Sequence, residues 1–221
     1  MKNKIFVISL VIAAIVFMNT GAIGADTKMQ TAGSACITPS EEDLKLALRT
    51  LWNEHIVWTR LAIMSLAAGS DDKDSVSNRL LKNSGDMANA LKPFYGNETG
   101  SKYGDLIKEH LVIAAGLVEA AKAGNTTGVN DADRKWHDNA DKIAAFENAI
   151  NPNLKLQDRK DMWNEHLNLT KTEAVAILTK DYPTSISTYD MIEQKAMMMA
   201  DALTNAIVEQ FPEKFGVAGT K

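Results

Sequence analysis

The chain has 221 residues, of which 45% are hydrophobic and 24% charged, and its formal net charge is −4. This composition excludes a disordered chain and is sufficient for one compact domain with a hydrophobic core. The acidic balance disfavours nucleic acid as a partner, and a single cysteine, Cys36, excludes an internal disulfide. Frequent Ala, Leu, Met and Lys, with few β-branched or aromatic runs, predict an all-α fold.

The first 25 residues have the pattern of a secretory signal peptide. Lys2 and Lys4 precede an apolar stretch from Ile5 to Met18, which small residues follow. The alternative is an uncleaved anchor, because residues 5–25 are almost long enough to span a bilayer. Both interpretations predict an extracytoplasmic protein, secreted, periplasmic or at the cell surface, and limit membrane contact to this segment. Without residues 1–24 the chain keeps 22 basic and 28 acidic residues, a net charge of −6.

Helix signals begin after residues 26–39, a Thr-, Gly-, Ser- and Ala-rich segment that predicts a flexible tether. Ser40 is a candidate N-cap, Gly69 and Gly124 are candidate C-terminal stops, and Pro93 and Pro212 follow other helices. These signals define a helical domain at 40–212 and a C-terminal tail at 213–221. The predicted helices cover residues 44–68, 74–91, 102–123, 131–150, 157–179 and 184–211.

A Glu-His pair recurs along the chain. "WNEH" occurs at 52–55 and at 163–166, and the shorter "KEH" occurs at 108–110, so the histidines are 55 and 56 residues apart. Gly69 and Gly124 each follow a histidine by 14 residues, and Lys180 holds the matching position in the third repeat. A unit of this length contains one helical hairpin, whose apolar face is buried only against its neighbours. We therefore predict a six-helix bundle of three hairpin repeats, closed on itself rather than stacked as a solenoid.

Helical periodicity places the three histidines, His55, His110 and His166, on faces that are otherwise apolar, so their imidazoles are expected to point inward. The preceding glutamates lie about 100° round the helix, at the edge of that face. The second helix of each hairpin carries a polar residue 28, 29 or 27 positions after the histidine. These expected partners are Asn83, Asn139 and Glu193, and two further acids, Asp86 and Asp141, lie where they could accept a histidine N–H.

Two explanations of this pattern remain open. In the first, imidazoles from different helices converge with carboxylates on a transition metal ion, zinc, iron or copper. The candidate ligands are His55, His110, His166, Glu193, Glu54, Glu109 and Glu165, supported by Asn83, Asp86, Asn139 and Asp141. In the second, the protein is a structural or interaction protein of the cell envelope, and each histidine is satisfied within its own hairpin and only fixes helix packing. Both explanations allow a protein partner or a homo-oligomer. Basic pairs such as Arg159-Lys160 are interpreted as solvated helix faces rather than as a nucleic-acid surface.

The segments "LWNEHIVWTRLAI", "LIKEHLVIAAGLVEAAKAG" and "MIEQKAMMMADAL" resemble a family of small exported helical proteins of bacteria and archaea, over most of residues 44–212. The resemblance implies a helical fold and export but no catalytic residues. Some members are labelled acetylglutamate kinase, although this chain has neither a glycine-rich phosphate loop nor alternating strands and helices. A hydrolase that uses Glu54, Glu109 or Glu165 as acid or base is a third alternative. We expect an exported binding protein rather than an enzyme.

Overall fold

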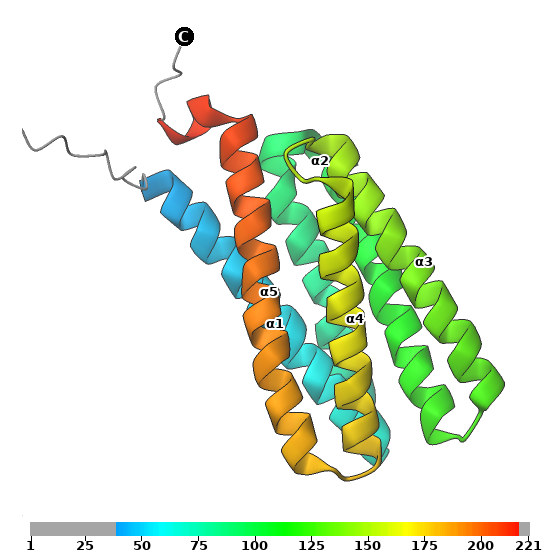
Figure 1. The fold of residues 1–221 in the computed structure, drawn as a ribbon. Helices are drawn as coiled ribbons and strands as arrows, with labels where there is room; N and C mark the ends of the chain where they lie inside the picture. The colour runs from blue at the N-terminus through cyan, green and yellow to red at the C-terminus, as the bar shows by residue number, and fades with distance from the viewer. Residues whose placement is uncertain (1–38, 217–221) are drawn as a thin grey trace, which may run out of the picture. The chain divides into compact units, whose positions relative to one another are not determined.

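The structure is a computed structural model that describes residues 39–216, and it contains helices and no β-strand within that range. The helices are α1 (Pro39–Ala68), α2 (Lys73–Lys122), α3 (Thr126–Ile150), α4 (Leu156–Leu178), α5 (Tyr182–Gln210) and the short 3-10 helix η1 (Pro212–Phe215) (Figure 1). The all-α prediction is confirmed. The predicted signal peptide, residues 26–38 of the predicted tether and residues 217–221 lie outside the described residues. None of the helices between residues 39 and 216 has the length and apolar character of a membrane-spanning segment.

Helix α2 differs most from the sequence-based prediction, because it covers both the second and the third predicted helix. The predicted loop between them is helical except at Gly96, which has φ 82° and ψ 167°. Glycine tolerates this positive φ because it has no Cβ, and Pro93 just before it offers no backbone N–H to continue the helical hydrogen bonds. A single residue, Gly96, therefore turns the chain in place of the predicted loop.

The two halves of α2 pack against each other. A Cβ added at Gly104 would lie 2.7 Å from the Cβ of Ala88 and 3.0 Å from the carbonyl oxygen of Ser84. In a straight helix residues 88 and 104 would be about 24 Å apart. The turn at Gly96 therefore reverses the chain, and glycine at 104 allows the close approach.

Helices α1, α2 and α4 end in the same backbone conformation. Gly69, Gly124 and Lys180 have φ angles of 67°, 66° and 62°. The left-handed conformation is ordinary for a glycine after a helix and uncommon for lysine, whose Cβ makes it unfavourable. Lys180 therefore adopts a conformation that its residue type does not favour, and it follows His166 by the same 14 positions that separate Gly69 from His55 and Gly124 from His110.

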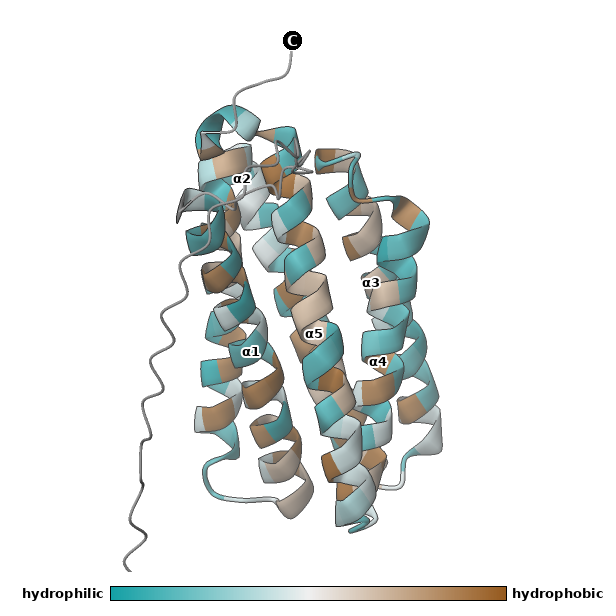
Figure 2. Ribbon diagram, turned by 60° about the vertical axis from the view of Figure 1, so that its left-hand side comes forward, coloured by the Kyte–Doolittle hydropathy of each residue, from teal (hydrophilic) through white to brown (hydrophobic). Residues whose placement is uncertain are grey.

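The helices form a bundle in which α5 packs against both α4 and α1, so the first and last long helices are in contact. Each helix carries both hydrophilic and hydrophobic residues along its length (Figure 2). The innermost side chains come from all five α-helices and include Trp52, Ile107, Ile143, Trp163 and Ala196. The core extends past the predicted domain end at residue 212, because Phe215 of η1 is buried against Phe94, with ring centroids 5.8 Å apart.

Candidate metal site

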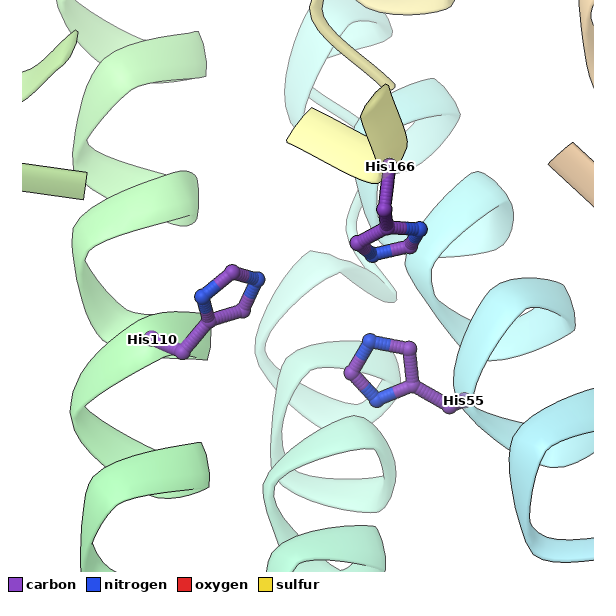
Figure 3. A group of neighbouring side chains, drawn as sticks. All are labelled: His55, His110 and His166. Carbon is purple, nitrogen blue, oxygen red and sulfur yellow. The ribbon is translucent and has the colours of Figure 1, made fainter. Parts of the chain in front are cut away.

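Three histidines from three different helices meet in the bundle interior. His55 lies on α1, His110 on the second half of α2 and His166 on α4 (Figure 3). Each of the three residues is 1% exposed. Their ring centroids are 6.3 Å apart for His55 and His110, 5.6 Å for His55 and His166, and 6.1 Å for His110 and His166. One potential ligand nitrogen from each lies within 4.8 Å of the other two. We call these three residues the histidine cluster.

Two of the histidines are held by asparagines of their own hairpin, as predicted. The Nδ1 atoms of His55 and His110 each lie 3.2 Å from an amide oxygen, of Asn83 and Asn139 respectively. The Asn83 amide nitrogen donates to the Leu51 carbonyl, so its oxygen is the acceptor and His55 Nδ1 carries the proton. Asn139 is oriented in the same way by the Leu106 carbonyl. This tautomer leaves Nε2 with the lone pair that a metal ion requires.

The third histidine has no such partner. His166 Nδ1 is buried and makes no hydrogen bond within the described residues, and the predicted partner Glu193 is exposed on α5. The neighbouring Ile192 holds the buried position of α5, so Glu193, one residue further along the helix, is rotated by about 100° toward solvent. A buried polar atom without a partner is costly, by about 1–3 kcal/mol, and calls for an explanation such as a bound ion.

Three tryptophans surround the histidine cluster. The rings of Trp52 and Trp163 contact it, with centroid distances of 5.4 Å from Trp52 to His55 and 5.3 Å from Trp163 to His110. Trp136 does more, because its indole Nε1–H donates to His110 Nε2 over 3.1 Å. Both nitrogens of His110 are therefore engaged. The sequence placed these tryptophans only on apolar helix faces, and the position of Trp136 one turn before Asn139 was the one available signal.

Burial keeps the cluster uncharged. Desolvation lowers the pKa of His55 to about 4 and that of His166 to about 3. The pKa of His110 also falls well below its ordinary value, through burial and through the two neighbouring imidazoles. All three rings are neutral at pH 7, which is the form that binds metal ions.

The predicted carboxylate ligands lie elsewhere. Glu54 pairs with Arg79 at 3.1 Å and Glu165 with Lys195 at 2.8 Å, while Glu109 accepts from the Asn139 amide at 3.0 Å. Among residues 39–216, the only group of three or more His, Cys, Asp or Glu side chains close enough to share an ion is the histidine cluster. The glutamates stay outside because the residue before each histidine is rotated by about 100° toward the helix surface.

The predicted supporting acids are not bonded to the histidines either. Asp141 pairs with Lys160 at 2.9 Å. Asp86 is half-buried, and the His55 Nδ1–H donates instead to the amide oxygen of Asn83. Within the described residues the support for the histidines therefore comes from amides and an indole.

A second group of buried polar residues contacts Trp163 and was not predicted from the sequence. Glu147 and Arg159 are both buried and form a two-point ion pair, with N–O distances of 2.7 Å and 3.1 Å. Trp163 Nε1 donates to Glu147 at 3.1 Å, and the Tyr103 hydroxyl donates to it at 3.3 Å. The interpretation of Arg159 as a solvated residue is wrong. The Glu147 carboxylate of this ion pair therefore holds Trp163, whose ring contacts the histidine cluster.

Comparison of the chain with known protein families, with curated proteins and with solved structures finds no match. The resemblance to exported helical proteins therefore stays a prediction, and function has to be argued from the site itself.

Proposed function

We propose that the protein binds one transition metal ion through His55, His110 and His166, with Zn²⁺ as the best match. The observation that carries this proposal is the convergence of three neutral, buried imidazoles from three helices. Imidazole nitrogen suits zinc and copper, whereas calcium and magnesium require oxygen ligands. Three histidines leave a fourth position for water or another small ligand, as in other three-histidine zinc sites.

The distances between the histidine nitrogens are close to those found around a bound zinc ion. Nitrogens around a tetrahedral zinc ion, with bonds of about 2.0–2.1 Å, lie roughly 3.4 Å apart. The present upper limit of 4.8 Å means that the rings would close by up to about 1.4 Å, a movement within the reach of side-chain rotation. This movement of the three rings would also bring His166, whose Nδ1 has no hydrogen-bond partner, into the coordination of the ion.

In this proposal the cluster arises from three copies of one helical hairpin, α1 with the first half of α2, the second half of α2 with α3, and α4 with α5. Supporting observations are the chain reversal at Gly96 and the left-handed residues Gly69, Gly124 and Lys180, each 14 positions after a histidine. Three related hairpins place equivalent residues about a common axis, where they can share one ion. The protein would act outside the cytoplasm, as the N-terminal pattern predicts.

A structural role is the second candidate. The hydrogen bonds of His55 to Asn83 and of His110 to Asn139 and Trp136 satisfy polar groups without any ion. Buried polar networks of this kind can fix the pairing of helices. His166 argues against it, because a histidine kept only for packing is expected to have a partner at Nδ1, as His55 and His110 have.

Metal binding is tested by titrating metal-free protein with Zn²⁺ in a calorimeter and measuring zinc by elemental analysis after dialysis. We expect one ion per chain in the wild type. His166→Leu keeps the volume and removes one ligand, so the affinity should fall more than about 100-fold, beyond the usual effect of losing a supporting residue. His137→Leu is the matched control, because His137 lies outside the cluster and bonds the Asp133 carbonyl. Wild-type protein without stoichiometric zinc, or equal affinity in His166→Leu, would contradict the proposal and favour the structural role.

Trp136 competes with the ion for His110 Nε2, because that nitrogen accepts the indole proton. Trp136→Phe removes the donor, so zinc affinity should rise by roughly two- to tenfold, the equivalent of one hydrogen bond of about 0.5–1.5 kcal/mol. The same calorimetric titration measures this effect. Trp58→Phe is the control, since Trp58 packs on Arg79 instead. An unchanged or weaker affinity in Trp136→Phe would show that His110 does not bind the ion through Nε2.

A further inference from the structure

A cavity of about 350 Å³ lies next to the histidine cluster. It is lined by α1, both halves of α2, α3 and α4. The residue one turn after each histidine belongs to its wall: Thr59 after His55, Ala114 after His110 and Thr170 after His166. The cavity therefore adjoins all three histidine-bearing helices at the level just beyond the cluster.

Trp136 connects the cavity to the cluster. Its side chain lines the cavity and its indole nitrogen donates to His110. The hydroxyls of Thr59 and Thr170 donate to the carbonyls of His55 and His166 within their own helices, so their protons are already used. The part of the cavity wall nearest the histidines therefore consists of the Trp136 ring and of two threonine hydroxyls that already donate their hydrogen bonds within their own helices.

The rest of the lining selects against charge. Aliphatic residues such as Ile63, Leu66, Leu80 and Leu111 dominate it. Of the two charged residues, Lys171 pairs with Asp133 at 2.8 Å and Glu119 is exposed. A charged ligand would lose its hydration here without gaining a counter-charge. The volume lies at the lower end of small-molecule sites, which are mostly apolar with a few polar groups.

We propose that this cavity binds one small, uncharged, mainly apolar molecule beside the histidine cluster. The inference goes beyond metal binding and does not depend on it, since none of the three histidines lines the cavity. The ligand would contact Trp136 on one side and the aliphatic wall on the other.

The test uses metal-free protein and the neutral fluorescent probe N-phenyl-1-naphthylamine. We expect a saturable increase in probe emission with one site per chain, reversed by octan-1-ol and at least tenfold less effectively by octanoate at pH 7. Gly116→Phe should weaken probe binding at least tenfold, because Gly116 lines the cavity and a Cβ there meets nothing within 4 Å. Ala115→Phe fills the cavity from the neighbouring position and is a second variant in case the first does not fold.

Gly85→Phe is the matched control. Gly85 is also an exposed glycine of α2 with open space around its Cβ, but it does not line the cavity. Wild-type affinity in this variant, with weakened binding in a folded Gly116→Phe or Ala115→Phe protein, supports the proposal. Absence of saturable binding, or equal binding in the filled and control variants, overturns it, and equal displacement by octanoate overturns the preference for an uncharged ligand. Because no metal is present, none of these outcomes depends on zinc binding.

Discussion

Metal-free protein is expected to lose most of its stability as the pH falls from about 6.5 to about 4. The unfolded chain binds a proton at each histidine near pH 6.5, whereas in the folded chain the pKa is about 4 for His55, about 3 for His166 and well below the ordinary value for His110. Between these limits the unfolded state holds more protons, so the free energy of unfolding decreases as the pH decreases. Each histidine contributes about 1.4 kcal/mol per pH unit.

Because three histidines contribute, the free energy of unfolding is expected to change by roughly 4 kcal/mol per pH unit where the dependence is steepest. A domain is stable by only about 5–15 kcal/mol in total, so unfolding before pH 4 is the expected result. Denaturant unfolding in the presence of a chelator, at pH 7, 6 and 5, measures the slope.

His166→Leu provides the internal test of this prediction. The variant removes one titrating ring and loses no hydrogen bond at Nδ1, so the slope should fall by about a third while stability at pH 7 changes little. His137→Leu should keep the full slope, because His137 is only half-buried and lies outside the cluster. Equal slopes in wild type and His166→Leu would mean that the buried ring does not govern acid stability.

Glu147→Gln is expected to lower the free energy of unfolding by about 3–5 kcal/mol, because it leaves the Arg159 guanidinium buried without a counter-charge. The substitution keeps the size of the side chain, so the effect reports charge rather than a cavity. Denaturant unfolding at pH 7 measures the change.

Glu165→Gln is the control for that prediction. Glu165 pairs with Lys195 at 2.8 Å, but Glu165 is exposed, and an ion pair of this kind contributes about 0–1 kcal/mol. Similar losses in the two variants would show that burial does not set the strength of the Glu147–Arg159 pair. Because Trp163 also donates to Glu147, its emission should change in Glu147→Gln and not in Glu165→Gln.

Local periodicity was enough to predict several features. The inward faces of His55, His110 and His166 follow from the helical repeat of 3.6 residues, and the structure places these side chains in the core. The asparagine partners followed from spacing within one hairpin, where the geometry of two adjacent helices is nearly fixed. Such features depend on residues close in sequence, so the sequence contains the information.

Other features depended on small rotations that accumulate along a helix. Glu193 lies on the surface, although its spacing resembles those of Asn83 and Asn139, because the neighbouring Ile192 takes the buried position of α5. Arg159 precedes the half-buried Lys160 in the sequence, yet the Arg159 side chain itself is buried and paired with Glu147. The sequence pattern of charged residues cannot distinguish a buried charge from an exposed one, because the partner of a buried charge, such as Glu147 for Arg159, lies on another helix.

By itself the sequence determined an all-helical chain with three histidines facing the interior, since both properties follow from local propensity and periodicity. Only the tertiary structure decided that the three rings meet each other, that Glu54 and Glu165 pair with Arg79 and Lys195, and that Trp136 donates a hydrogen bond to His110. The distances between rings depend on how helices pack across the bundle, and no local pattern specifies that packing. For the same reason the cavity beside the cluster, lined by four helices, is a property of the fold alone.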